Sequence, residues 1–192
     1  MTLDELSNYL AINSNQYYIG SENIEVTDDV LQGLSQRGLG IYGNYRPSLI
    51  LEQININSNP QVFSKINGRD VISIKNLYLI NPTLVEKAEP VDFSYKFVKE
   101  TKTMYTNFFG IYWAEVLVVP ILDEISIAEI DFLNIMIALY IKYIASVRKG
   151  FTIEGLPFNN DAVELYSQGQ ELLNNTLQNL ESSNSNWYLA VK

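Results

Sequence analysis

The chain of 192 residues contains neither cysteine nor histidine, and this double absence constrains its fold more than any motif does. Without cysteine no disulfide can close the structure, and without either residue the commonest ligands of structural zinc are missing. The fold must therefore be held together by packed apolar side chains, and hydrophobic residues make up 47% of the sequence. A chain of this length can bury a substantial core, so we expect a fold that depends on its core alone.

The same absences narrow the chemistry that the chain can perform. Histidine is the usual proton shuttle near neutral pH, and cysteine is a ready nucleophile and soft metal ligand. Binding, assembly and carboxylate catalysis remain. We therefore expect that the chain is not an enzyme and that it has no catalytic residue and no cofactor. We assign no residue to a metal site, and the sequence leaves open whether a metal ion is bound.

The charge of the chain argues against two kinds of partner. The net charge is -9, with 13 Lys and Arg against 22 Asp and Glu. Nucleic acids and anionic membranes are bound by clustered basic residues, which the sequence lacks. The apolar run from Phe132 to Ile141 has about half of the ~20 residues that a membrane span needs, so it predicts a buried helix.

Helix signals mark both ends of the sequence. Thr2 and Glu5 have the spacing of a capping box, which predicts a helix to about Ile12. Thr27, followed by two aspartates, predicts the start of a second helix that Pro47 ends.

Two more helices are predicted after the middle of the chain. Ser126 and Glu129 form a second capping-box pattern, flanked by a hydrophobic staple of Ile125 with Ile130, and Gly150 ends this helix. A last helix begins near Asp161 and is expected to pack on the preceding one.

The region between these helices has the alternation and the β-branched and aromatic content of strands. The predicted strands are Gln53 to Asn57, Asp70 to Leu79, Phe93 to Phe97 and Ile111 to Val119. The expected fold is therefore α+β, with a central, mostly antiparallel sheet, an N-terminal helical part and a C-terminal helical pair. We expect a single domain over residues 1–192, whose two terminal segments could extend toward other molecules.

Three patterns could carry chemistry, and each has a plainer interpretation. Gly38 to Gly43 matches the dinucleotide fingerprint, but a helix precedes it where a strand is required, so a helix end is favoured. Asp92 with Glu100 and Lys102 resembles the acids and lysine of metal-dependent nucleases, but the match is short and an acidic surface would repel a phosphate backbone, so a solvated hairpin is favoured. The paired acids, such as Asp123 with Glu124, suit glycosidase chemistry, but acids are also common at helix starts.

The aromatic residues are spread along the chain, with a notable group at its end. The polar run from Ser182 to Asn186 is followed by Trp187, Tyr188 and Leu189. Terminal segments are usually polar and frayed, so this ending predicts a segment that docks, either on its own domain or on a partner.

One segment begins with Val26–Leu31, continues through Arg37-Gly38-Leu39 and ends in the Tyr-x-x-x-Arg-Pro pattern of residues 42–47. It resembles an early helix of small virion proteins of tailed bacteriophages. An acidic start, an Arg-Ala-Leu triplet and this ending recur there, and Gly38 stands where alanine is expected. The resemblance covers about a tenth of the chain. It implies a non-enzymatic subunit of a neck, head-tail connector, tail or baseplate ring.

The resemblance implies two kinds of partner, which are further copies of the chain in a homo-oligomeric ring and neighbouring virion proteins. We expect no specific binding of nucleic acid and no membrane contact. The location is the virion, assembled in the host cytoplasm. The expected partner-binding residues are Trp187, Tyr188 and Leu189 in the tail, and Tyr42, Tyr45 and Arg46 as a second contact. A soluble cytosolic ligand-binding or adaptor module is the alternative, and a carboxylate-based or metal-dependent hydrolase is the third.

Overall fold

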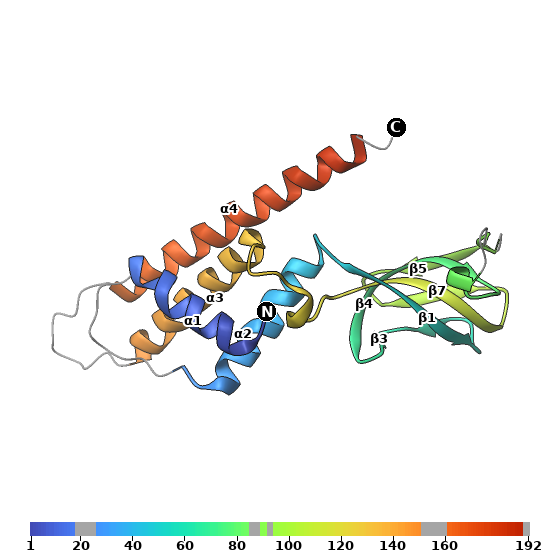
Figure 1. Cartoon of the computed structure of the whole chain (residues 1–192), viewed down its shortest axis with the longest axis horizontal. Coiled ribbons are helices and arrows are strands. Elements are labelled where there is room, and N and C mark those ends of the chain that lie inside the picture. Colours follow the sequence, from blue (N-terminus) through green and yellow to red (C-terminus); the bar gives the residue numbers. More distant parts are fainter. Residues whose placement is uncertain (18–25, 85–88, 92–93, 151–160, 190–192) are drawn as a thin grey trace. The chain divides into compact units, whose positions relative to one another are not determined.

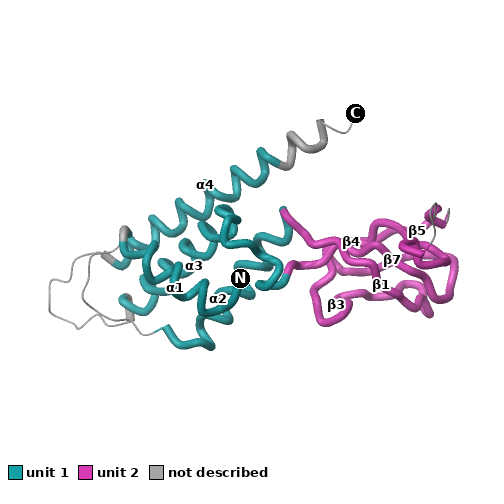
Figure 2. The backbone as a smooth tube through the Cα atoms, in the orientation of Figure 1, with its two compact units in different colours: residues 1–45, 121–192 teal, residues 46–120 magenta. Residues whose placement is uncertain are grey.

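The computed structural model describes residues 1–17, 26–84, 89–91, 94–150 and 161–189 (Figure 1). Within these ranges, residues 16, 149–150, 161 and 184–189 are described by their backbone only. The chain divides into two compact units (Figure 2). The helical unit comprises residues 1–45 and 121–192, and the β unit comprises residues 46–120. The predicted α+β class, with helices at both ends and antiparallel strands in the middle, is confirmed. The expectation of a single domain over residues 1–192 stays a prediction.

The helical unit is built around one central helix. Its elements are α1 (Leu3–Asn13), η1 (Ser14–Gln16), α2 (Asp28–Gly43), η3 (Leu122–Glu124), α3 (Ile130–Gly150) and α4 (Asp161–Leu189). Helix α3 packs against α1, α2 and α4. Its Phe132, Ile135 and Met136 are fully buried, so the core of the unit forms around α3. The predicted pairing of the last two helices is confirmed.

The first predicted helix start is confirmed and the third is wrong. Thr2 N donates to Glu5 Oε2 over 2.8 Å, and Glu5 N donates to Thr2 Oγ1 over 3.2 Å, which completes the capping box. Ser126 instead accepts at Oγ from Ala128 N, in a turn that precedes the helix. Helix α3 begins only at Ile130, which is exposed, so no staple with Ile125 forms.

The glycine-rich segment from Gly38 to Gly43 forms the C-terminal end of α2, as the plainer interpretation predicted. Gly38 faces α3 so closely that a Cβ there would lie 2.3 Å from Met136 Sδ. Met136 is fully buried and has little room to move aside. Glycine at this position therefore allows the close approach of α2 to α3.

Helix α3 is long and apolar enough, from Ile130 to Arg148, to cross a membrane. Most of this stretch is buried inside the structure, and the core helix of a globular unit meets the same criterion of length and composition. The predicted buried helix is confirmed as the core of the helical unit.

The β unit consists of two antiparallel sheets in the described part of the chain. The larger has the order β1 (Ser48–Ile56), β7 (Gly110–Val118), β4 (Arg69–Tyr78) and β3 (Lys65–Ile66). The smaller sheet has the order β2 (Gln61–Val62), β6 (Thr103–Thr106) and β5 (Tyr95–Val98). A short 3-10 helix, η2 (Pro82–Leu84), follows β4 of the larger sheet.

The core of the β unit receives side chains from both sheets. Along β7 every second side chain is buried, from Tyr112 to Val118, as expected of a strand with one face on a core. Met104 of β6 joins the same cluster, and Tyr95 and Phe97 of β5 pack against it. Each sheet therefore has an inner face on the shared core and an outer face.

Strand pairing explains how the β unit fits between α2 and α3 in the sequence. The chain enters the unit through β1 and leaves it through β7, and these strands are antiparallel neighbours in which Ser48 is opposite Val118. The two ends of the inserted segment therefore lie side by side, as tolerated insertions require.

Candidate interaction surfaces

No group of three or more Asp and Glu that could hold a metal ion occurs among the residues that the structure describes. Glu100 and Lys102 lie in the turn between β5 and β6, consistent with the hairpin interpretation, and Asp92 lies outside the described residues. Glu129, one of the candidate acids, accepts a hydrogen bond from Tyr42.

One hollow lies against the outer face of the larger sheet. It measures about 280 Å³, is open to solvent, and is lined by β1, η2 and Glu115 of β7. The lining residues are Leu49, Ile50, Leu51, Pro82, Thr83 and Glu115. Its volume is at the lower end of ligand sites, and it lacks the aromatic lining expected of the ligand-binding alternative.

Glu115, the acidic residue of this hollow, is fixed by its neighbours on β4. Its Oε1 accepts from Tyr78 Oη over 3.0 Å, and its Oε2 accepts from Asn76 Nδ2 over 2.6 Å. Burial, together with the hydrogen bond to Glu115, raises the pKa of Tyr78. Both carboxylate oxygens are thus engaged in holding β7 to β4, which favours a structural role for Glu115.

Apolar side chains surround this hollow. We call Leu49, Leu51, Leu84 and Leu117 the apolar face. Leu49 is opposite Leu117 in the β1–β7 register, and Leu84 follows the two η2 residues that line the hollow. Leu49 is 59% exposed and Leu84 is 78% exposed. Exposed apolar groups of this kind mark interaction sites.

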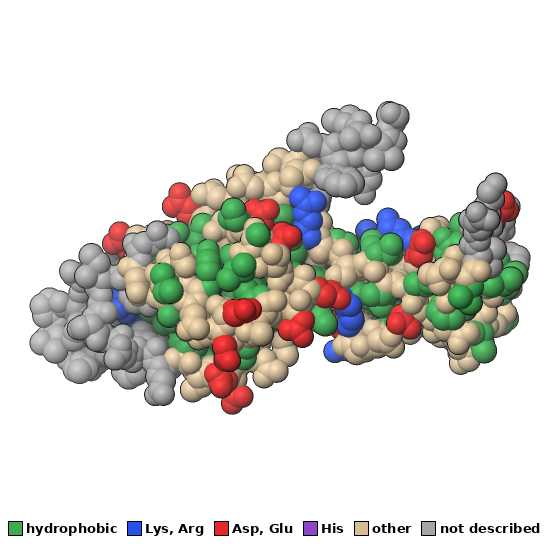
Figure 3. All heavy atoms as spheres, in the orientation of Figure 1, with side chains coloured by type: hydrophobic (Ala, Val, Ile, Leu, Met, Phe, Trp, Pro, Cys, Tyr) green, Lys and Arg blue, Asp and Glu red, His purple; other side chains and the backbone are tan. Residues whose placement is uncertain are grey.

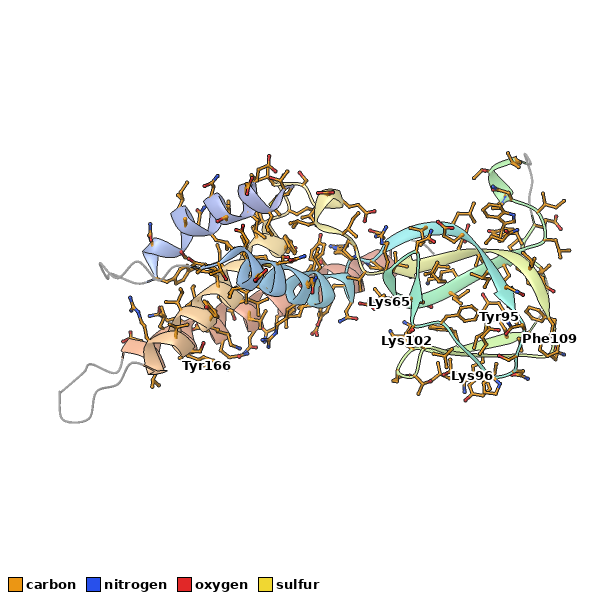
Figure 4. All side chains as sticks on the ribbon, turned by 90° about the horizontal axis from the view of Figure 1, so that it is seen from below. Lys65, Tyr95, Lys96, Lys102, Phe109 and Tyr166 are labelled. Carbon is orange, nitrogen blue, oxygen red and sulfur yellow. The ribbon has the colours of Figure 1, made fainter. Side chains whose placement is uncertain are left out.

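The smaller sheet carries a different surface, which we call the lysine face and define as Val62, Lys96, Lys99, Lys102 and Tyr105. Lys96 and Tyr105 are directly opposite each other on β5 and β6. Because their neighbours Tyr95, Phe97 and Met104 pack in the core, Lys96 and Tyr105 point outward. Figure 4 shows Lys96 pointing away from the β unit and Tyr95 lying between its sheets.

The two units differ sharply in charge. The β unit has eight Lys and Arg against seven Asp and Glu, whereas the helical unit has five against fifteen. Figure 3 shows acidic side chains across the helical unit. The overall charge of -9 therefore belongs to the helical unit, and the β unit is nearly neutral.

Of the predicted contact residues, Tyr42 and Tyr45 serve the helical unit itself. Tyr42 is buried, its ring packs edge-on against Phe132 at 5.6 Å, and its Oη donates to Glu129 Oε2 over 3.0 Å. Tyr45 Oη donates to Glu181 Oε1 over 3.2 Å, which connects the end of α2 to α4. Burial and Glu181 raise the pKa of Tyr45.

Arg46 is half-buried at the first residue of the β unit and is already engaged. The structure therefore assigns Tyr42 an internal role and leaves Tyr45 and Arg46 partly accessible.

The predicted docking tail coincides with the end of α4. The polar run from Ser182 to Asn186 continues the helix, and Trp187, Tyr188 and Leu189 form its last residues. Their side chains lie outside the described residues. Helix α4 has 29 residues against 21 in α3, and Leu180 is its last buried side chain in the described part.

Sequence reasoning missed the lysine face because β6 was not predicted as a strand. The signal lies in residues 95–106, where Tyr-Lys-Phe-Val and Thr-Met-Tyr-Thr flank a Lys-Glu-Thr-Lys turn. Alternation on both sides of such a turn predicts a hairpin.

The sequence matches no protein-family model, and no curated protein shows significant similarity to it.

Proposed function

We propose that this chain is a non-enzymatic structural subunit that binds copies of itself, and that it belongs to the virion of a tailed bacteriophage. In this role it forms a ring at the neck, head-tail connector or tail, together with neighbouring virion proteins. The apolar face of the β unit is the observation that supports binding between copies of the chain. The sequence resemblance supports the assignment to a virion and the formation of a ring.

The apolar face supports self-binding because the β unit does not use it for its own core. Leu84 and Leu49 expose most of their side chains while the core between the two sheets is filled by other residues. Burying such side chains at an interface gains about 1.5–3 kcal/mol for each leucine that becomes fully buried. A second copy of the chain is the partner to which we assign this face.

The other two function classes have weaker support. A ligand-binding module needs an enclosed site, whereas the hollow beside Glu115 is small and open. A carboxylate hydrolase needs two acids free to act on a substrate, whereas Glu115 and Glu129 are both held by tyrosines. An acidic exterior also suits a ring through which DNA passes without binding.

Replacing Leu84 with aspartate is expected to weaken self-association at least tenfold without unfolding the protein. The side chain is 78% exposed, so the free energy of unfolding should change by less than about 0.5 kcal/mol. Ile12→Asp, at a 73% exposed position of α1, is the matched control and should leave association unchanged. Sedimentation velocity over a concentration series measures both. Equal association of the Leu84→Asp variant and the wild type would contradict the role of the apolar face.

A further inference from the structure

We propose that the lysine face of one copy docks on an acidic surface of the helical unit of the next copy. This inference rests on the proposed self-assembly and adds to it the pair of surfaces that joins neighbouring subunits. We call the acidic surface the acid end and define it as Asp4, Glu5, Asp123, Glu129 and Asp131.

The lysine face has the composition of a docking surface. Tyr105 is 47% exposed and Val62 is 63% exposed, and β2 and β5 both pair with β6, so the two apolar groups lie on the same sheet as Lys96. Phe63 N donates to the Lys102 carbonyl oxygen over 2.8 Å, which holds the turn of the hairpin against the chain after β2. An aromatic and aliphatic centre with a charged rim is typical of protein interfaces.

The lysines of this face are free to bind an external partner. Within the described ranges, the side chains of Lys96, Lys99 and Lys102 have no ion-pair or hydrogen-bond partner. Lys65 differs, because its Nζ lies 3.7 Å from Asp70 Oδ1. Exposed ion pairs within one chain contribute little, but a cluster of unpaired lysines beside Tyr105 steers an acidic partner to this face.

The acid end is assembled from segments far apart in the sequence. The Met1 ammonium group donates to the carbonyl oxygens of Ile125 (2.9 Å) and Leu122 (3.4 Å), which holds the start of α1 against η3. This contact joins the acids of the first turn of α1 to those of η3 and the start of α3. Residues 1–13 and 121–131 contain no lysine or arginine. The acid end therefore contains five carboxylates, and the only positive charge from its own segments is the Met1 ammonium group.

Charge complementarity selects a second copy as the occupant. The lysine face and the acid end are different surfaces on the same chain, so their contact is heterologous, and each copy keeps one free surface of each kind for the next. Repetition of such a contact forms a ring when the rotation closes. Nucleic acid is the less favoured occupant, because the whole chain carries a charge of -9.

Two charge-reversal variants test this pairing. Lys96→Glu with Lys99→Glu makes the lysine face acidic, and Asp4→Lys with Asp123→Lys makes the acid end basic. All four side chains are exposed, and Glu5, which completes the capping box, is left in place. Each variant alone should associate at least tenfold more weakly than the wild type, because like charges then meet. An equimolar mixture should recover association to within about threefold of the wild type.

The control pair is Lys75→Glu and Glu171→Lys, which reverse exposed charges outside both surfaces. Neither control variant nor their mixture should differ from the wild type. Circular dichroism checks that every variant folds, and sedimentation velocity at 50 and 300 mM NaCl measures association, which should weaken at the higher salt.

The outcomes separate this inference from the proposed function. If the wild type associates and the reversed variants associate equally well, the pairing of these surfaces is wrong while self-assembly stands. If the wild type is monomeric at every concentration, both are wrong. If Lys96→Glu with Lys99→Glu abolishes binding of a single-stranded oligonucleotide but leaves association intact, the lysine face binds nucleic acid and the inference is overturned.

Discussion

Replacing Gly169 with leucine is expected to lower the free energy of unfolding of the helical unit by about 3 kcal/mol. Gly169 is buried where α4 packs closely against α3. A Cβ added there would lie 2.8 Å from Lys142 Cγ and 3.0 Å from the carbonyl oxygen of Ala138. Lysine can move aside, but a backbone oxygen inside α3 cannot, so the two helices must separate.

Gly33→Ala is the matched control for this prediction. Gly33 also lies inside a helix, but a Cβ there would meet no atom within 4 Å. Alanine should therefore raise stability by about 0.5–1 kcal/mol, because glycine loses more backbone entropy on folding. Urea denaturation followed by helical circular dichroism measures both variants. A Gly169→Leu variant as stable as the wild type would show that α3 and α4 do not pack as closely as described.

Replacing Phe132 with alanine should cost about 3–5 kcal/mol, confined to the helical unit. Phe132 is fully buried in α3 and packs edge-on against Tyr42. The β unit has a separate core between its two sheets, so its strands should keep their protection. Native-state hydrogen exchange should show faster exchange of amides in α2 and α3, with β4 and β7 unchanged.

Val116→Ala gives the reverse test. Val116 is fully buried in the core of the β unit, and its truncation should cost about 2 kcal/mol. Exchange should then rise in β4 and β7 and stay constant in α3. Equal effects of both substitutions on all of these elements would show that the chain unfolds as one cooperative unit rather than as two.

Local sequence signals predicted the elements whose causes lie within a few residues. The capping box of Thr2 depends only on Glu5 three positions later, and the β-branched and aromatic content of residues 111–119 marks β7 wherever it pairs. Between β3 and β4, Asn67 and Gly68 both adopt positive φ, which an Asn-Gly pair tolerates in a tight turn.

The elements that were not predicted have both local and long-range causes. The Ser126 pattern did not start α3, because Ser126 Oγ accepts from Ala128 N in a separate turn. Strands β2 and β3 have two residues each, too few to show a period. The pairing of β1 with β7, in which Ser48 is opposite Val118, joins residues far apart in the sequence, and no local pattern reveals it.

The candidate surfaces were predictable to a smaller extent. Tyr42 was expected in a contact and makes one, but with Glu129 and Phe132 of its own chain. The apolar face and the lysine face depend on strand register, which decides the side of a sheet on which each side chain lies. The role of Trp187, Tyr188 and Leu189 stays a prediction.

The central claim is that this chain binds copies of itself, and its molar mass in solution tests that claim most directly. Light scattering over a hundredfold range of concentration, with the full chain and with a variant lacking residues 187–192, measures the mass. We expect a mass that rises with concentration to a fixed multiple of the monomer mass, and a lower mass for the variant if the end of α4 takes part. A full-length chain that remains a monomer throughout would show that the chain does not bind copies of itself.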